Sequence, residues 1–227
     1  MSNISLDING LYKAYKKNII FTDANMSVKG GDCIALVGEN GCGKSTLINI
    51  IANIIKLDKG TITFNIDDEE IPMNKAWEYV SYVPQHNSLI DTLSAYDNLL
   101  FWYQGDRKKL NQDIKEGFIK ELGIDQYINK RVNRMSGGMQ KRVSIACALA
   151  NNPRILLLDE ANASLDIVCK LQIQKMLQKY AAMGNIVIHS THEEGDIGVC
   201  NKIFYIADQK ITEVPMTSLK DIFKDKL

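Results

Sequence analysis

Residues 38–46 constrain the fold more than any other stretch of this chain. They read Gly-Glu-Asn-Gly-Cys-Gly-Lys-Ser-Thr, which fits the phosphate-binding pattern of a glycine, four residues and then Gly-Lys-Ser/Thr. A short apolar run at 33–37 precedes this loop, and a segment rich in leucine and isoleucine follows it. Such runs are typical of a buried parallel strand and a buried helix. The sequence therefore predicts a strand, a phosphate-binding loop and a helix, in that order.

The residue types in this loop match what a bound nucleoside triphosphate requires. Gly41 and Gly43 let the backbone curl so that successive N–H groups point at an anion, and the dipole of the following helix adds to the attraction. Lys44 is expected to reach the β- and γ-phosphates, and the Ser45 hydroxyl to hold magnesium. The alternative, a glycine-rich turn with an incidental lysine, does not explain the flanking strand and helix. The residues expected to bind nucleotide, with Cys42 as a small filler, are Gly38, Glu39, Asn40, Gly41, Cys42, Gly43, Lys44, Ser45 and Thr46.

The composition narrows the class of protein. With 227 residues the chain suits one domain that buries a core of its own. Lysine plus arginine and aspartate plus glutamate both number 27, so no overall field favours nucleic acid or an anionic membrane. The five cysteines form no Cys-x-x-Cys pair, which indicates reduced intracellular thiols rather than disulfides or zinc. Because there is neither an apolar run of about 18 residues nor an N-terminal signal region, we expect a cytoplasmic protein that reaches a membrane only through a partner.

The first 85 residues read as strands around the phosphate loop. Asn9-Gly10 is a turn signal after a short alternating strand, and Gly30-Gly31 breaks the chain before the strand of the loop. The helix after the loop carries apolar residues as far as Ile55. Pro84 ends a further β-prone run. The expected strands lie within 3–28 and at 33–37, 61–66 and 80–83.

Residues 92–150 look helical throughout, because apolar residues recur at four-residue spacing over 110–122. Ser136 is the expected N-cap of a helix that runs to about Ala150. Strands and helices then alternate again. The expected elements are a strand at 155–158 that ends in Asp159-Glu160, a helix at 167–182 stopped by Gly184, a strand at 186–188 that leads to His192, strands at 203–206 and 210–214, and a terminal helix near 217–225.

This alternation predicts an α/β fold with a mostly parallel sheet that is covered on both faces. The helical block is an insertion between the two nucleotide strands, since Gly38 and Asp159 lie 159 − 38 = 121 residues apart. Asp159 and Glu160 stand at the carboxyl end of a strand, where open α/β sheets hold their ligands.

Residues 135–142, Met-Ser-Gly-Gly-Met-Gln-Lys-Arg, form the most specific segment. They resemble the signature motif of ABC proteins, Leu-Ser-Gly-Gly-Gln in its usual form, at the family spacing before an acidic strand end. Over nearly its whole length the chain resembles the ATP-binding subunit of an ABC transporter. Further matches are Pro84-Gln85 to the Q-loop, 163–166 to the D-loop, His192 to the switch histidine, and Tyr15, 38 − 15 = 23 residues before the phosphate loop, to the aromatic residue that stacks on adenine.

Each of these single residues also has a plain structural interpretation. Tyr15 could be an ordinary strand tyrosine, Gln85 a surface residue and His192 a capping residue, but their spacing to the other motifs favours function. The two other histidines get only plain interpretations: His189 is expected to be a core residue, and His86 a solvated neighbour of Gln85.

The resemblance implies a fold and a set of roles. The fold is a P-loop NTPase core at 1–85 and 152–227 with an N-terminal antiparallel β subdomain, and an inserted helical subdomain at 86–151. The implied cofactors are ATP and Mg²⁺. Tyr15 would stack on adenine, and Ser45 and Gln85 would bind magnesium, with Asp159 acting on its water shell. Glu160 would polarise the attacking water, and His192 would sense the γ-phosphate. The residues implied to bind a second subunit's γ-phosphate are Ser136, Gly137 and Gly138.

The resemblance also implies partners: a second ABC ATPase chain, identical or different, in a head-to-tail dimer, and an integral membrane permease. The permease would hold the chain at the cytoplasmic face of the membrane. Nucleic acid is not expected as a partner. Met139 in place of the signature glutamine, followed by basic residues, is similar to export-type subunits. Ala161 and Asn162 replace the usual proline and threonine beside the active site. These changes are expected to affect the rate of hydrolysis and its coupling to transport rather than the chemistry itself.

Two alternatives belong to other classes. One is a non-transport ABC ATPase that acts on DNA or ribosomes, but such proteins usually carry a coiled-coil insertion or a second fused nucleotide domain. The other is a regulatory module of a membrane complex whose ATPase has decayed. The residues that argue against it, all intact, are Lys44, Asp159, Glu160 and His192.

Overall fold

The computed structural model describes residues 3–161 and 165–218, and its larger sheet confirms the mostly parallel arrangement. The strand order in this sheet is β10-β9-β3-β8-β7-β6. Neighbouring strands run parallel except at the β9–β10 pair. The strands are β3 (Cys33–Gly38), β6 (Val80–Val83), β7 (Ile155–Asp159), β8 (Ile186–Ser190), β9 (Lys202–Ala207) and β10 (Lys210–Val214).

A second, antiparallel sheet is built from the N-terminal part of the chain, with the order β2-β1-β4-β5. All of its pairs are antiparallel. It is the antiparallel β subdomain that the family resemblance implied. Its strands are β1 (Ile4–Tyr15), β2 (Asn18–Lys29), β4 (Lys59–Ile66) and β5 (Glu69–Ile71).

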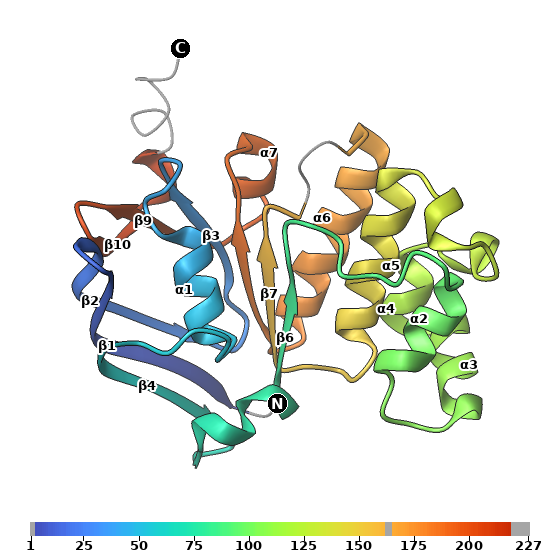
Figure 1. Ribbon diagram of the computed structural model, residues 1–227, viewed down its shortest axis with the longest axis horizontal. Coiled ribbons are helices and arrows are strands. Elements are labelled where there is room, and N and C mark those ends of the chain that lie inside the picture. The colour runs from blue at the N-terminus through green and yellow to red at the C-terminus, as the bar shows by residue number, and fades with distance from the viewer. Residues whose placement is uncertain (1–2, 162–164, 219–227) are drawn as a thin grey trace.

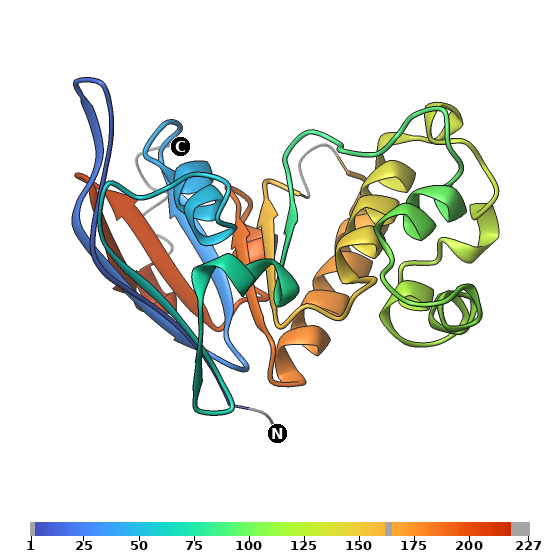
Figure 2. The ribbon, with the colours of Figure 1, turned by 60° about the horizontal axis from the view of Figure 1, so that its bottom comes forward.

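The helices cover both faces of the larger sheet and extend beyond it. Figure 1 shows α1 on one side of β6 and β7 and α6 on the other, with α2 to α5 gathered beyond α6; Figure 2 shows the same order from a second direction. The α-helices are α1 (Lys44–Ile51), α2 (Ala95–Trp102), α3 (Arg107–Lys115), α4 (Gly117–Glu121), α5 (Gly137–Leu149), α6 (Ile167–Ala182) and α7 (Glu194–Ile197). Short 3-10 turns are η1 (Met73–Glu78), η2 (Asp125–Tyr127), η3 (Val132–Arg134) and η4 (Met216–Ser218).

Alternation along the buried strands divides the interior into two cores. On β3, Ile34 and Leu36 join one core while Ala35 and Val37 join the other, because successive side chains of a strand point to opposite faces. The first core contains the apolar side of α1 and the inner face of the antiparallel sheet. The second core contains the apolar sides of α5 and α6. The loop between β3 and α1 is thus anchored at both ends in packed structure.

The structure corrects the expected turn at Asn9-Gly10. Strand β1 continues through these residues as far as Tyr15. Gly10 has a φ of +60°, and the pairing of β1 with β2 shifts between Ile8 and Leu11. The glycine therefore makes a bulge that bends the strand rather than a turn that reverses it.

Helix lengths also differ from expectation. Helix α1 ends at Ile51, and Asn53 has a φ of +57°, so Ile54 is 60% exposed instead of lying on a buried face. The apolar spacing over 110–122 spans two helices because Glu116, between α3 and α4, has an extended backbone. Residues 92–150 are accordingly a set of helices and 3-10 turns. The terminal helix expected near 217–225 falls mostly outside the described residues.

Candidate functional site

Two glycines of the phosphate loop adopt left-handed backbone conformations. Gly41 and Gly43 have φ values of +81° and +115°, which favour glycine because a side chain there is strained. A Cβ atom at Gly43 would also lie 2.6 Å from the Ile20 Cγ2 atom of β2. The antiparallel sheet therefore packs directly against the phosphate loop and leaves no room for a side chain at position 43.

The Lys44 side chain folds back over the first residues of the phosphate loop. It is 5% exposed, and its Nζ donates hydrogen bonds to the carbonyl oxygens of Gly38 and Glu39, both at 2.9 Å. Beside it lies a cavity of about 140 Å³. The residues that line this cavity are Asn40, Gly41, Gly43, Lys44, Ser45, Thr46 and Glu160. The structure thus brings the predicted loop and the predicted carboxylate to one place, whereas the Cys42 thiol packs away from the cavity against the apolar core.

The two carboxylates at the carboxyl end of β7 have different environments. Asp159 is 4% exposed, and its Oδ1 accepts a hydrogen bond of 2.6 Å from the Ser190 hydroxyl. The same hydroxyl accepts a hydrogen bond of 2.9 Å from the backbone N–H of Glu160. Glu160 has a φ of +45°, an uncommon conformation for a residue with a side chain, which costs about 1–3 kcal/mol and is typical of functional sites. Ser190 fixes this turn, and the Glu160 side chain reaches the cavity.

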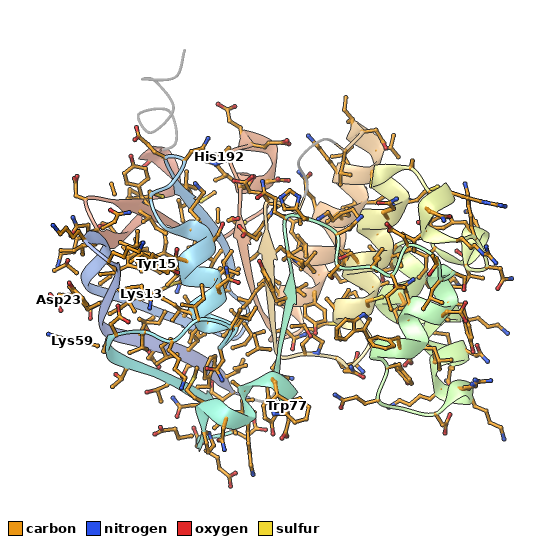
Figure 3. All side chains as sticks on the ribbon, viewed as in Figure 1. Lys13, Tyr15, Asp23, Lys59, Trp77 and His192 are labelled. Carbon is orange, nitrogen blue, oxygen red and sulfur yellow. The ribbon has the colours of Figure 1, made fainter. Side chains whose placement is uncertain are left out.

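The Glu160 carboxylate contacts the two other residues that the sequence placed in the site. Gln85 Nε2 donates a hydrogen bond of 2.7 Å to Glu160 Oε2. His192 Nε2 lies 3.3 Å from Glu160 Oε1. Figure 3 shows His192 at the end of the molecule where β6 and β7 finish. The three side chains form one polar cluster next to the phosphate loop.

The topology of the sheet explains this meeting. The phosphate loop, His192, Glu160 and Gln85 follow the strands β3, β8, β7 and β6, which are consecutive neighbours in the sheet. Because these strands are parallel, their carboxyl ends meet at one edge, the usual ligand position of open α/β sheets.

Tyr15 lies at the end of β1, apart from this cluster, and its side chain is 44% exposed. Lys13 Nζ sits 5.3 Å from the centroid of the Tyr15 ring (Figure 3). Asp58 holds the strand end in place by accepting hydrogen bonds from Lys13 Nζ at 2.9 Å and from the Ala14 N–H at 2.8 Å. These hydrogen bonds keep the pKa of Asp58 below its usual value. Tyr15 therefore presents an exposed aromatic surface on a fixed strand end.

The signature segment lies elsewhere. Ser136 caps α5, its hydroxyl accepting a hydrogen bond of 3.3 Å from the Met139 N–H. Ser136 and Gly137 are exposed, and neither they nor Gly138 line the cavity of the phosphate loop. Of the expected D-loop at 163–166, residues 163 and 164 lie outside the described residues, as does Asn162, while Asp166 caps α6 by accepting a hydrogen bond from the Cys169 N–H. Within the described chain Ser136 and Gly137 are thus open to solvent, and no residue of 135–142 lines the phosphate loop cavity.

The comparison with known proteins identifies the family. The family model described as ABC transporter matches residues 21–163, which is more than half of the chain. The chain belongs to this family. We refer to it below as the cassette.

Two curated relatives illustrate the range of the family. The cassette is 32% identical over 196 residues to the Nod factor export ATP-binding protein I of Bradyrhizobium diazoefficiens, covering 85% of this chain and 63% of that protein. It is 28% identical over 228 residues to the spermidine/putrescine import ATP-binding protein PotA of Haemophilus influenzae, covering 97% of this chain and 59% of that protein. The cassette thus spans about three fifths of the length of these relatives. Since one is an export protein and the other an import protein, the predicted export direction stays a prediction.

A solved structure supports the biochemical class. It is a dimeric ATP-binding cassette in a post-hydrolysis state, bound to ADP and Pi, and it matches with a TM-score of 0.79 and 28% identity over 93% of this chain and 98% of that chain. Together with the family match, this likeness shows that the chain has the fold of an ABC ATP-binding cassette. Within the described residues, none of its helices has the length and apolar character to cross a membrane.

Two residues of the site were missed by the sequence reasoning. Ser190 bridges Asp159 and Glu160, and its position at the end of β8, two residues before His192, could have indicated a role. Lys141 donates to the carbonyl oxygens of Pro84 and Gln85, and no sequence signal pointed to that contact. By contrast, His189 lies in the core of the cassette as expected, 1% exposed, where burial lowers its pKa.

Proposed function

We propose that the cassette powers a membrane transporter as one half of an ATP-dependent dimer, with each nucleotide bound between two chains. The observation that carries this proposal is that the two half-sites are separate. Glu160, in contact with Gln85 and His192, lies beside the phosphate loop, while Ser136 is exposed at the start of a helix in the helical block. A site split in this way is completed by a second copy or by a related chain, arranged head to tail.

Hydrolysis needs positioning and charge neutralisation more than covalent chemistry. The backbone N–H groups of the loop and the N-terminus of α1 would bind the phosphates, and Lys44 would turn from the loop carbonyls to the β- and γ-phosphates. Glu160 would accept a hydrogen bond from the attacking water and polarise it. His192, in contact with Glu160, would sense whether the γ-phosphate is present, and Tyr15 would stack on the base.

Magnesium fits the donors at this edge of the sheet. Among the described residues no cluster of three or more His, Cys, Asp or Glu side chains could hold a metal alone, but Mg²⁺ usually binds through substrate phosphates and one or two protein oxygens. The Ser45 hydroxyl, which lines the cavity, and the Gln85 amide oxygen would be direct ligands, with Asp159 acting through water. When bound, the ion would neutralise charge on the phosphates.

Removal of magnesium tests this assignment. Phosphate release from ATP should fall to background in EDTA and return on addition of Mg²⁺, because uncompensated phosphate charge opposes attack. Ser45→Ala should raise the Mg²⁺ concentration needed for half-maximal activity, whereas Ser88→Ala, the same change at an exposed residue outside the cavity, should leave it unchanged. ATPase activity that persists in EDTA would contradict the magnesium assignment.

The small size of the loop cavity favours a shared site. At about 140 Å³ it is well below the roughly 300–1,000 Å³ that pockets for small-molecule ligands occupy, so it suits the phosphate end of a nucleotide only. We propose that residues 86–151 form one unit and residues 1–85 with 152–227 another. In the dimer, the signature of one chain, Ser136 to Gly138, would then close over the γ-phosphate held by the other.

A groove between these two units is the proposed contact with an integral membrane permease. It has a volume of about 330 Å³, and its lining includes Trp77, Tyr82, Leu89, Trp102 and Cys147. Trp77, at the end of the molecule opposite His192 in Figure 3, is 63% exposed, and Trp102 is 48% exposed. A groove that has exposed aromatic residues and both apolar and polar side chains in its lining suits a short amphipathic helix. We propose that a cytoplasmic helix of the permease docks here, which places the cassette at the cytoplasmic face of the membrane.

Cross-linking tests the groove. A cysteine at Ser88, on the groove wall, should be joined by a short bifunctional thiol reagent to a membrane protein when the assembled transporter is treated. A cysteine at Thr212, exposed on β10 and outside the groove, is the matched control and should give no such product. Capture of the membrane protein at Thr212 but not at Ser88 would place the contact elsewhere.

A further inference from the structure

The chain segment after β6 is tied to helix α5 at two points. Lys141 Nζ donates hydrogen bonds to the carbonyl oxygens of Pro84 at 3.1 Å and of Gln85 at 3.3 Å. The preceding residue on α5, Gln140, accepts a hydrogen bond of 2.7 Å from Asn87 through its Oε1. The helix that begins at the signature therefore holds the backbone of the segment that carries Gln85.

The burial of Lys141 shows that its hydrogen bonds matter. The side chain is 7% exposed, and burial lowers its pKa while the nearby charge of Asp159 acts in the opposite direction. Within residues 3–161 and 165–218 its ammonium makes no ion pair within 4.0 Å. Burying a charged group without such a partner is costly, and an apolar side chain of similar length would fill the same space at lower cost. Packing alone therefore does not account for a lysine here.

We propose that Lys141 is a positioning residue that keeps Gln85 within reach of Glu160 and couples Gln85 to Ser136. The two ends of this connection lie on one rigid element, since Ser136 is 141 − 136 = 5 residues away, or about 7.5 Å along the helix. The inference rests on the proposed function, in which Gln85 serves the nucleotide of its own chain and Ser136 that of the other. A movement of Gln85 would then move the signature that faces the second nucleotide.

Lys141→Met tests this role, since it keeps the length of the side chain and removes its donors. We expect kcat to fall roughly 10- to 100-fold, the usual effect of misplacing a catalytic group by about 1 Å. KM for ATP should stay at the wild-type value, because the phosphate loop is untouched. The melting temperature should also stay at the wild-type value, because methionine fills the same space without burying a charge. Lys141→Arg should restore most of kcat, since a guanidinium can donate to both carbonyls. Lys120→Met, on the exposed side of α4, is the matched control and should behave as wild type.

A double-mutant cycle separates positioning from a merely structural role. If Lys141 acts through Gln85, the Gln85→Ala, Lys141→Met protein should have the same kcat as Gln85→Ala alone. The inference would be overturned if the double variant lost kcat by the product of the two single losses, or if the Lys141→Met protein had the wild-type kcat. If Lys141→Met does not fold, Lys141→Gln, which keeps one amide donor, replaces it in the cycle with the same expectation. Wild-type protein that forms no ATP-dependent dimer, either with itself or with a related chain in the assembled transporter, would instead refute the proposed function.

Discussion

Replacing Glu160 by glutamine is expected to leave ATP binding intact and to lower the rate of hydrolysis by roughly 10²–10⁴-fold, the usual contribution of a positioned general base. The carboxylate accepts a hydrogen bond of 2.7 Å from Gln85 and lies 3.3 Å from His192. A glutamine fits the same space but cannot accept a proton from water. The loss should therefore appear in the chemical step and not in nucleotide affinity.

Single-turnover hydrolysis and binding of a fluorescent ATP analogue measure these two quantities separately. Glu194→Gln is the matched control, because it makes the same change on an exposed residue of α7, and it should hydrolyse ATP at the wild-type rate. A Glu160→Gln protein that turns over at nearly the wild-type rate would remove Glu160 from the mechanism.

Local patterns predicted much of the fold because they reflect local physics. The apolar runs of β3 and β7 and the polar residues that end them follow from burial on both faces of a parallel sheet. Gly184, with a φ of +90°, stops α6 as expected. Asn9-Gly10 misled the prediction because a glycine with positive φ serves a bulge as well as a turn, and only the register of β1 against β2 and β4 decides between them.

The candidate site was predicted residue by residue, but its contacts were not. Gln85 and Glu160 lie 75 positions apart, and they meet only because β6 is the sheet neighbour of β7. Strand order of this kind is set by the packing of the whole chain. The same holds for Ser190, which reaches Asp159 across the neighbouring strands β8 and β7, and for Lys141, whose partners are backbone carbonyls that carry no sequence signal.

The shared site makes a second large-effect prediction. Lys44→Ala removes the cation at the phosphates of its own chain, and Ser136→Arg blocks the signature that would face the other chain's nucleotide, so each protein alone should be inactive. When the two are mixed, a dimer of one chain of each kind has one site with both lesions and one with neither. If one intact site works alone, random pairing restores roughly a quarter of wild-type activity. A chain that carries both changes is the matched control: mixed with wild type, it puts one lesion in each shared site and gives inactive mixed dimers.

Phosphate release from ATP by the 1:1 mixture of Lys44→Ala and Ser136→Arg proteins is therefore the most direct test of the central claim. Light scattering or native mass spectrometry establishes that mixed dimers form. The account predicts that activity, absent in either protein alone, returns on mixing, and that the doubly changed chain suppresses wild type. Mixed dimers that form and stay inactive, together with full activity of the wild-type chain beside the doubly changed one, would show that each chain completes its own site and would contradict the account.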